Sequence, residues 1–327
     1  MRTNPILSVV IPAYNEEQSI SLVEEAVCRV LSEAGIRYEI VFVDDGSRDR
    51  TWEQICATGK TKPNVRGVHF SRNFGKEAAI LAGLEQAIGD CCVVIDSDLQ
   101  HPPETIVEMY QLWQEGFEVI EAQKAARGKE TAVHGLAAKC FYALISKAAG
   151  FDMANASDFK LLDRKAVDAL LRIHEHNSFF RALSSWIGYR TATVQFEVRD
   201  RVAGESKWST RSLVKYALNN IASFSAAPMQ LVTILGVLLL IVSVVLSAVA
   251  LVQKLSGVAL GGFTTLILLL SFSSSIIMIS LGIIGYYIAK IYEEVKGRPR
   301  YLISDLLNSD GDSANDISEK NNLTDRN

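Results

Sequence analysis

Two long stretches without a charged residue constrain this chain more than any other feature. Residues 229–252 and 255–289 contain no Asp, Glu, Lys or Arg and are rich in Leu, Ile and Val. A helix needs about 20 apolar residues to cross a membrane, and both stretches exceed that length. Two buried helices of a large core are the alternative, which this length and apolar density disfavour. We therefore predict a hairpin of two transmembrane helices within residues 228–290, at about 229–252 and 264–289.

The basic residues around this hairpin predict its orientation. Lys and Arg are enriched in cytoplasmic segments next to transmembrane helices. The connecting loop carries only Lys254, whereas basic residues flank both outer ends of the hairpin: Lys207, Arg211 and Lys215 before it, and Lys290, Lys296, Arg298 and Arg300 after it. The N-terminal sequence has too short an apolar run for a signal peptide. We therefore expect a multi-pass protein with both termini in the cytoplasm.

Two further segments adjoin the hairpin. Residues 207–227 mix aromatic and aliphatic residues with basic residues and serines. This pattern is typical of an amphipathic helix lying on a membrane, although an ordinary surface helix would look similar. Residues 291–327 form a predicted cytosolic tail. From about residue 308 this tail is polar without apolar periodicity, so we expect disorder there.

Composition excludes some classes of protein. The 327 residues carry a formal net charge of −4, whereas nucleic-acid-binding proteins usually carry a basic surplus. The five cysteines form no CxxC pair, and we expect reduced thiols and not disulfides or a zinc site. They are Cys28, Cys56, Cys91, Cys92 and Cys140.

The first part of the chain, residues 1–206, alternates short apolar runs with amphipathic stretches. The predicted strands are 7–11, 40–43, 65–70 and 91–95, and the predicted helices are 16–32, 51–57, 76–88 and 103–115. Residues 154–198 continue the pattern, with a strand and then a helix in "SDFKLLDRKAVDALL". Such alternation predicts an α/β fold with a mainly parallel sheet and helices on both faces. Ligands of these sheets bind beyond the carboxyl ends of the strands.

Polar clusters follow three of the predicted strands at that edge. They are "PAYNE" at 12–16, "DDGS" at 44–47 and "DSD" at 96–98. Asp96, Asp98 and Gln100 present oxygens at alternate positions, and hard divalent cations such as Mg²⁺ prefer oxygen ligands. A simple turn is the other interpretation of the Asp pair. We interpret His101 as a loop residue, because no second His or Cys lies at ligand spacing.

Six motifs in order resemble those of glycosyltransferase family 2: "VVIPAYNEE", "FVDDGSRDRT", "SRNFGKEAAILAGL", "IDSDLQHPPE", "SDFKLLDR" and "RVAGESKW". They are most similar to its polyprenyl-phosphate branch, which includes bactoprenol glucosyltransferases and dolichol-phosphate mannose synthase. The two predicted spans and the ending "EEVKGRPRYLI" are similar to bacterial members. The resemblance covers about residues 7–303 and implies a GT-A-like catalytic domain on a bacterial inner membrane.

The same resemblance implies the reaction. We expect inverting transfer of a sugar from a nucleotide sugar to undecaprenyl phosphate, with Mg²⁺ or Mn²⁺ neutralising the donor diphosphate. The product would be a polyprenyl-phosphate-linked monosaccharide for cell-envelope glycosylation. UDP-glucose is the expected donor, ahead of UDP-N-acetylhexosamine, UDP-aminoarabinose and GDP-mannose. A homo-oligomer is compatible with the sequence.

The resemblance also implies roles for individual residues. Asp44 is expected at the nucleotide base, Asp45 near the ribose and Lys76 near the diphosphate. The cation is assigned to Asp96, Asp98 and Gln100. The complete donor-binding set is Pro12, Ala13, Tyr14, Glu16, Asp44, Asp45, Ser47, Lys76, Asp96 and Ser97.

Basic residues are expected to offset the repulsion between the acceptor phosphate and the donor diphosphate. The candidates are Lys124, Arg127, Arg201 and Lys207. The family more often has arginine at the position of Lys124, and lysine lacks the bidentate fork of arginine. The catalytic candidates are Asp98 and Asp158. A phosphate monoester is largely dianionic at neutral pH, so Asp158 would chiefly orient the acceptor or the sugar hydroxyls, with general-base work secondary.

Two other functions fit parts of the sequence. A non-catalytic, membrane-anchored sugar-nucleotide-binding scaffold is disfavoured, because the metal, donor and phosphate motifs are all intact. A processive polysaccharide synthase would carry a QxxRW motif, which the nearest stretch, "SFFRALSSWIG", lacks.

Overall fold

A computed structural model describes residues 4–124, 157–173, 175, 179–198, 227–256 and 262–307. The chain divides into two compact units. One contains Met1–Trp208 with Pro299–Asn327, and the other contains Ser209–Arg298.

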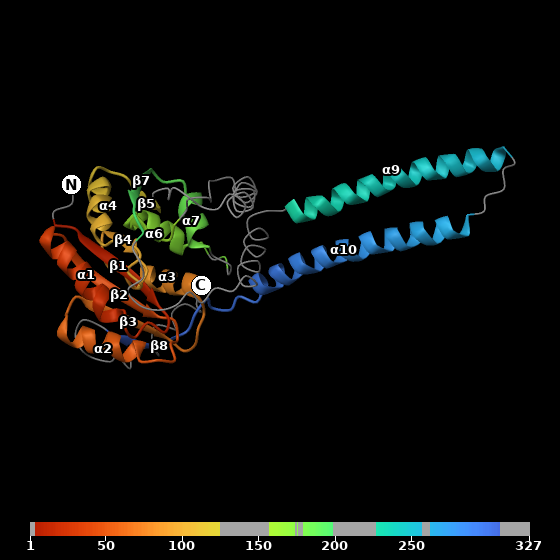
Figure 1. The fold of residues 1–327 in the computed structure, drawn as a ribbon. Coiled ribbons are helices and arrows are strands. Elements are labelled where there is room, and N and C mark those ends of the chain that lie inside the picture. The colour runs from red at the N-terminus through yellow and green to blue at the C-terminus, as the bar shows by residue number, and fades with distance from the viewer. Residues whose placement is uncertain are drawn as a thin grey trace. The chain divides into compact units, whose positions relative to one another are not determined.

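An eight-stranded mixed sheet forms the first unit (Figure 1). Its order is β7-β5-β6-β4-β1-β2-β3-β8. The strands are β1 (Ile6–Ala13), β2 (Arg37–Asp44), β3 (Val65–Phe70), β4 (Cys91–Val94), β5 (Val119–Lys124), β6 (Lys160–Asp163), β7 (Thr191–Phe196) and β8 (Ile303–Leu307). The four central strands β4, β1, β2 and β3 are parallel, and β5 is parallel to β7. Strands β6 and β8 run antiparallel to their neighbours.

Helices cover both faces of this sheet, which confirms the predicted α/β fold. Helices α1 (Ile20–Glu33), α2 (Thr51–Thr61) and α4 (Glu104–Gln114) share a core with Leu7, Val9 and Ile11 of β1. Helix α3 (Lys76–Gln86) packs on the other face. A Cβ added to Gly83 would lie 2.3 Å from Val10 Cγ1, so glycine lets α3 approach the sheet closely. The remaining helices of this unit are α6 (Arg164–Leu171) and α7 (Phe180–Trp186).

The predicted strands and helices of residues 7–115 are all present, with shifted ends. The largest shifts are at the start of α1, which begins at Ile20 and not at Glu16, and at the end of α2, which ends at Thr61 and not at Ala57. Glu16 precedes this helix, and its backbone N–H donates to Thr51 Oγ1 at 2.8 Å. The strand and helix predicted in "SDFKLLDRKAVDALL" are β6 and α6. Cys28, Cys56, Cys91 and Cys92 are thiols, as predicted, and Cys140 lies outside the described residues.

Strand β8 departs from the sequence analysis, which assigned residues 291–327 to a tail. It pairs antiparallel with β3, and the segment before it is also anchored. Ser71 N–H donates to Leu302 O at 3.0 Å, and the Tyr301 ring stacks on Phe70 with centroids 5.0 Å apart. A segment that follows the last apolar helix therefore completes the edge of the sheet.

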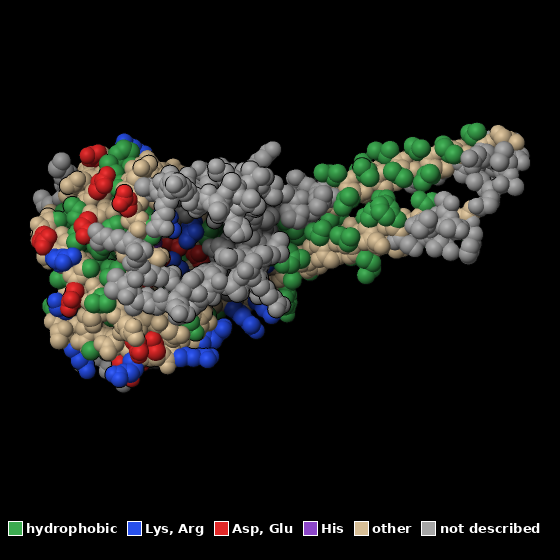
Figure 2. All heavy atoms as spheres, in the orientation of Figure 1, with side chains coloured by type: hydrophobic (Ala, Val, Ile, Leu, Met, Phe, Trp, Pro, Cys, Tyr) green, Lys and Arg blue, Asp and Glu red, His purple; other side chains and the backbone are tan. Residues whose placement is uncertain are grey.

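The second unit contains two long helices, α9 (Ala227–Leu255) and α10 (Phe263–Val295). Figure 2 shows hydrophobic side chains along both helices. Within the described residues, the stretch Phe272–Val295 is long and apolar enough to cross a membrane, whereas the apolar stretch Ile234–Leu246 in α9 is shorter than a span. The two helices are present as predicted, and their arrangement as a transmembrane hairpin stays a prediction. The predicted interfacial segment, residues 207–227, lies almost wholly outside the described residues.

Candidate active site

Three neighbouring parallel strands bring the predicted polar clusters to one edge of the sheet. Ala13 at the end of β1 is in register with Asp44 at the end of β2. On the other side of β1, Val10 pairs with Val94 of β4, and Ile95 N–H donates to Val10 O at 3.1 Å. The segments that follow β1, β2 and β4 therefore leave the sheet side by side, as ligand sites in such sheets require.

The loops after β1 and β2 are joined by hydrogen bonds. Asn15, with φ of +54°, donates its N–H to Ser47 Oγ at 2.8 Å and accepts from Arg48 N–H at 2.9 Å. Ser47 N–H in turn donates to Asp44 Oδ1 at 3.0 Å. Ser47 thus connects two loops that were both predicted to bind the donor.

Asp44 and Asp45 are both buried, but they face different partners. Asp44 Oδ2 lies 2.7 Å from His69 Nδ1, and the His69 ring stacks on Trp52 with centroids 5.0 Å apart. Asp45 accepts the N–H groups of Phe74 and Gly75 at 2.7 and 2.9 Å. Burial raises the pKa of Asp45 to about 6, although these two N–H donors oppose the shift.

Asp45 therefore holds the loop that precedes α3. Gly46 makes this contact possible, since a Cβ there would lie 2.3 Å from the Arg72 carbonyl carbon, and its φ is +64°. The predicted ribose contact of Asp45 stays a prediction, and the structure adds this anchoring role. Of the remaining predicted donor residues, Pro12, Ala13 and Ser97 are buried, and Tyr14 and Glu16 are half-buried.

The predicted cation ligands follow β4. Asp98 Oδ1 accepts from Gln100 N–H at 3.1 Å across Leu99, whose φ is +57°. Among the described residues, no three His, Cys, Asp or Glu side chains converge as metal ligands. Asp96 Oδ1 nevertheless lies 2.6 Å from the Lys76 ammonium, so this position attracts a positive charge. Two carboxylates and one amide oxygen are a donor set that fits a hard divalent cation.

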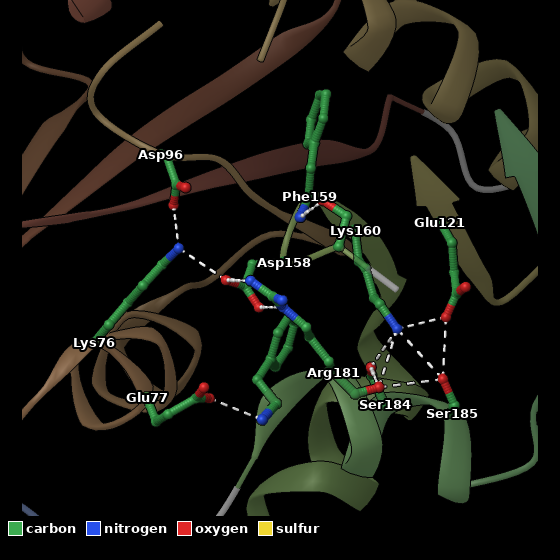
Figure 3. A network of polar contacts seen from close by, with 12 residues as sticks. Lys76, Glu77, Asp96, Glu121, Asp158, Phe159, Lys160, Arg181, Ser184 and Ser185 are labelled. Atoms are coloured by element: carbon green, nitrogen blue, oxygen red, sulfur yellow. Dashed lines mark hydrogen bonds and ion pairs between the residues drawn. The ribbon is translucent and has the colours of Figure 1, made fainter. Parts of the chain in front are cut away.

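Lys76 joins the cluster after β4 to Asp158 just before β6 (Figure 3). Its ammonium lies 2.8 Å from Asp158 Oδ2. Burial opposes the charged form of Lys76, but Asp96 and Asp158 outweigh this effect and raise its pKa above the usual value.

Asp158 has a second cationic partner, Arg181 of α7. Arg181 Nε and Nη2 donate to the two Asp158 oxygens at 2.6 and 2.8 Å, a bidentate pair. Burial alone would raise the pKa of Asp158, but Lys76 and Arg181 hold it below its usual range. A carboxylate with a depressed pKa is a poor proton acceptor, so the geometry favours an orienting role over a general-base role.

Glu77 and Lys160 extend this network on either side of Arg181. Glu77 Oε2 accepts the Phe180 N–H at 2.8 Å. Burial, with the nearby charge of Asp158, raises the pKa of Glu77 to about 7. Lys160, whose side chain is fully buried, contacts the Glu121 carboxylate and donates to Ser184 Oγ at 2.8 Å.

Sequence reasoning missed Glu77, Glu121, Lys160 and Arg181. A single lysine within the buried strand "FKLL" is the signal that could have drawn attention to Lys160. Arg181 belongs to "SFFRALSSWIG", which was considered only for the motif of a different enzyme class.

The predicted acceptor residues are mostly outside the described part of the chain. Arg127, Arg201 and Lys207 lie there, while Lys124 is exposed at the end of β5. His101 is in a loop, as predicted, but it is buried and stacks on Phe159 with centroids 5.0 Å apart.

Comparison with known proteins defines the class. The sequence profile of Glycosyl transferase family 2 matches residues 8–171. This span includes most of β1, all of β2 to β4, the loops that follow them and Asp158. The chain belongs to glycosyltransferase family 2.

Individual relatives resemble the chain over nearly its whole length. It is 38% identical to the putative glycosyltransferase CsbB of Bacillus subtilis over 98% of both chains. It is 35% identical to the SfII prophage-derived bactoprenol glucosyl transferase of Shigella flexneri, over 91% of this chain and 97% of the relative. Among solved structures, glucosyl-3-phosphoglycerate synthase from Mycobacterium tuberculosis, in complex with Mn²⁺, UDP-glucose and glycerol 3-phosphate, is 22% identical, with a TM-score of 0.47, and covers 67% of this chain and 78% of that one.

Proposed function

We propose that this glycosyltransferase moves a sugar from a nucleotide sugar to undecaprenyl phosphate, with inversion at the anomeric carbon. The similarity to a bactoprenol glucosyl transferase carries the proposal. That match covers 91% of the chain, so it includes residues of both the sheet unit and the helical unit. An enzyme that acts on a lipid-linked acceptor needs both a sugar-nucleotide site and an apolar anchor.

The donor would bind at the edge formed by the loops after β1, β2 and β4. Asp96, Asp98 and Gln100 would hold a divalent cation, which when bound neutralises the diphosphate and makes it a better leaving group. Lys76, which contacts Asp96 at 2.6 Å, would bind the diphosphate. We assign the nucleotide base and ribose to Pro12, Ala13, Tyr14, Glu16, Asp44 and Asp45, and we include Ser47 and Ser97 in the same donor-binding set.

Asp158 would orient the reactants and not remove a proton. The acceptor phosphate is largely dianionic near neutral pH and attacks without being deprotonated. Asp158 keeps the ammonium of Lys76 and the guanidinium of Arg181 in fixed positions, and fixed cations stabilise developing phosphate charge without reorganisation. Lys124, Arg127, Arg201 and Lys207 are the proposed acceptor-phosphate residues.

Connectivity supports a membrane hairpin. Strand β8 lies in the same sheet as β1 to β7, although α9 and α10 separate them in sequence. A chain that leaves one side of a membrane and returns to it must cross an even number of times. If α10 crosses, a second crossing must therefore occur between residue 198 and Phe272, and we assign it to α9. We propose a bacterial inner-membrane protein with its catalytic unit and both termini in the cytoplasm.

The proposed reaction is tested by identifying its lipid product. Membranes that contain the full-length protein are incubated with undecaprenyl phosphate and one nucleotide sugar at a time: UDP-glucose, a UDP-N-acetylhexosamine, UDP-aminoarabinose or GDP-mannose. Mass spectrometry of the lipids is expected to show undecaprenyl phosphate with a hexose, formed from UDP-glucose. A product from another donor would correct the sugar. Nucleotide-sugar binding with no lipid product from any donor would favour a binding scaffold.

A further inference from the structure

Lys160 and Glu121 form a buried ion pair that the proposed chemistry does not use. The Lys160 side chain is 0% exposed and that of Glu121 is 13% exposed. Burial lowers the pKa of Lys160, and the Glu121 carboxylate opposes this shift. A pair of this kind carries a large desolvation cost, and replacing it with apolar residues of similar volume is often neutral or stabilising. Stability alone therefore does not explain the pair.

The remaining contacts of Lys160 all lie on α7 (Figure 3). Its ammonium donates to the Ser184 hydroxyl at 2.8 Å, the Arg181 carbonyl at 3.2 Å and the Ser185 hydroxyl at 3.3 Å. Helix α7 has only seven residues, and no side chain caps its N-terminus. Such a short helix has little stability of its own, so these contacts determine where it lies.

Arg181 is consequently held at both ends by residues two positions apart. Asp158 binds its guanidinium, and Lys160 binds its backbone carbonyl. Asp158 lies in the bend just before β6 and Lys160 is the first residue of that strand, and both side chains contact α7. Glu77, next to Lys76 in α3, fixes the adjacent Phe180 N–H.

We propose that Lys160, with its partner Glu121, is a positioning residue for sugar transfer. It acts through Arg181 on Asp158 and Lys76 and does not contact the substrates. The inference rests on the proposed transfer to a lipid phosphate, because that reaction requires the two cations on Asp158 to be fixed.

The test uses the full-length protein in detergent with undecaprenyl phosphate and the active donor. For each variant, the maximal rate is divided by the concentration of UDP-binding sites found by titration to give kcat, so that misfolded protein is not counted. Lys160→Met is expected to lower kcat by about 10- to 100-fold, as small misplacements of catalytic groups do. The Kd for UDP should stay within about threefold, because Lys160 contacts Glu121 and α7 and not the residues assigned to the base and ribose.

Two further variants separate positioning from stability. Lys160→Met/Glu121→Leu removes both charges and is expected to unfold near the wild-type temperature while kcat stays low. Arg66→Met breaks another ion pair, Arg66–Glu39, whose side chains are 19% and 7% exposed, and should destabilise the protein with kcat unchanged. If the double variant regains wild-type kcat with its stability, the pair is only structural and the proposal is overturned.

A double-mutant cycle tests the route through Arg181. Coupled residues give non-additive effects. In an Arg181→Ala background, Lys160→Met is expected to lower kcat by less than about twofold. If the two losses multiply, Lys160 does not act through Arg181.

Amide hydrogen exchange of residues 180–186 distinguishes a failure of this inference from a failure of the proposed function. Exchange should be faster in Lys160→Met and in the double variant than in the wild type, whether or not a lipid product forms. Absence of product in the wild type with faster exchange refutes the function and leaves the positioning of α7 intact. Unchanged exchange, with an active wild type, refutes the positioning role alone.

Discussion

Carboxylates at the edge of the sheet are each held by cations or N–H groups, and these contacts limit the chemistry that each residue can perform. Asp158 shares Lys76 with Asp96 and forms a bidentate pair with Arg181. Its negative charge is thereby retained over the physiological pH range. The role that we propose for Asp158 is to hold two cations in place, and this role depends on its charge and position.

The proposed cation site predicts the effect of removing Asp98. Asp98→Ala is expected to lower transfer at least about 100-fold, because the lost cation contributes several kcal/mol to stabilising the leaving diphosphate. The variant should remain folded and membrane-bound. Glu108→Ala, an exposed acidic residue of α4, is the control. Full activity of the Asp98 variant, or wild-type activity that EDTA does not reduce, would contradict the assignment.

Glu77 makes the stability of the protein depend on pH. Its pKa rises from 4.5 in the unfolded chain to about 7 in the folded protein. Between these values the folded state holds a proton that the unfolded state has lost, so stability falls as pH rises from about 4.5 to 7. Above about pH 7 Glu77 is ionised in both the folded and the unfolded state, so its burial lowers the free energy of unfolding by an amount that no longer changes with pH.

Glu77→Gln is therefore expected to raise the melting temperature at pH 8 and to change it little at pH 4.5. The amide oxygen can still accept the Phe180 N–H, so the loss of the titrating group is the main change. Thermal unfolding of the detergent-solubilised protein measures the difference. Glu33→Gln, at an exposed position of α1, should show no such pH dependence. Equal effects of Glu77→Gln at both pH values would contradict the raised pKa.

At the scale of elements, the loop after β2, which is part of the proposed donor site, meets the loop before α3 at Gly46. Gly46 and Gly35 have almost the same φ, +64° and +66°. A methyl group added at Gly35 would meet nothing within 4 Å, whereas one added at Gly46 would lie 2.3 Å from the Arg72 backbone. Alanine substitutions at these two glycines therefore separate the effect of backbone strain on stability from the effect of a steric clash.

Gly46→Ala should destabilise the protein more than Gly35→Ala, which is expected to cost about 1–2 kcal/mol from its left-handed conformation alone. The clash in Gly46→Ala should also move the loop that Asp45 holds and weaken UDP binding. Denaturant unfolding and UDP titration measure the two effects. Equal losses of stability with unchanged UDP affinity in both variants would show that the loops do not need this close approach.

The elements that the sequence predicted well are those with strong local patterns. Strands β1, β2 and β4 contain apolar runs, and the polar clusters that follow them lie at one edge of the sheet, as predicted. Strand β8 could not be predicted this way, because "ISDLL" is short and gains its place only by pairing with β3. Arg181 was missed for a related reason: its partner Asp158 is 23 residues away, and only the fold brings them together.

For the whole molecule, the decisive prediction concerns membrane topology. Cysteines are introduced singly at Asp310 and Ser256 and labelled from the periplasm with an impermeant reagent. Labelling is expected at position 256, between the helices, and not at position 310. The wild-type chain, whose five cysteines all precede residue 227, is the control and should remain unlabelled. Labelling at position 310 would refute the proposed orientation.

The pairing of β8 with β3 also sets an order for the biogenesis of this protein. Residues 71–302, which include α9 and α10, are synthesised between the two strands. The β3 edge of the catalytic sheet therefore stays open until both apolar helices have left the ribosome. An open edge is a template for association with other chains. The nascent protein thus closes its sheet last, after the helices that would anchor it have been made.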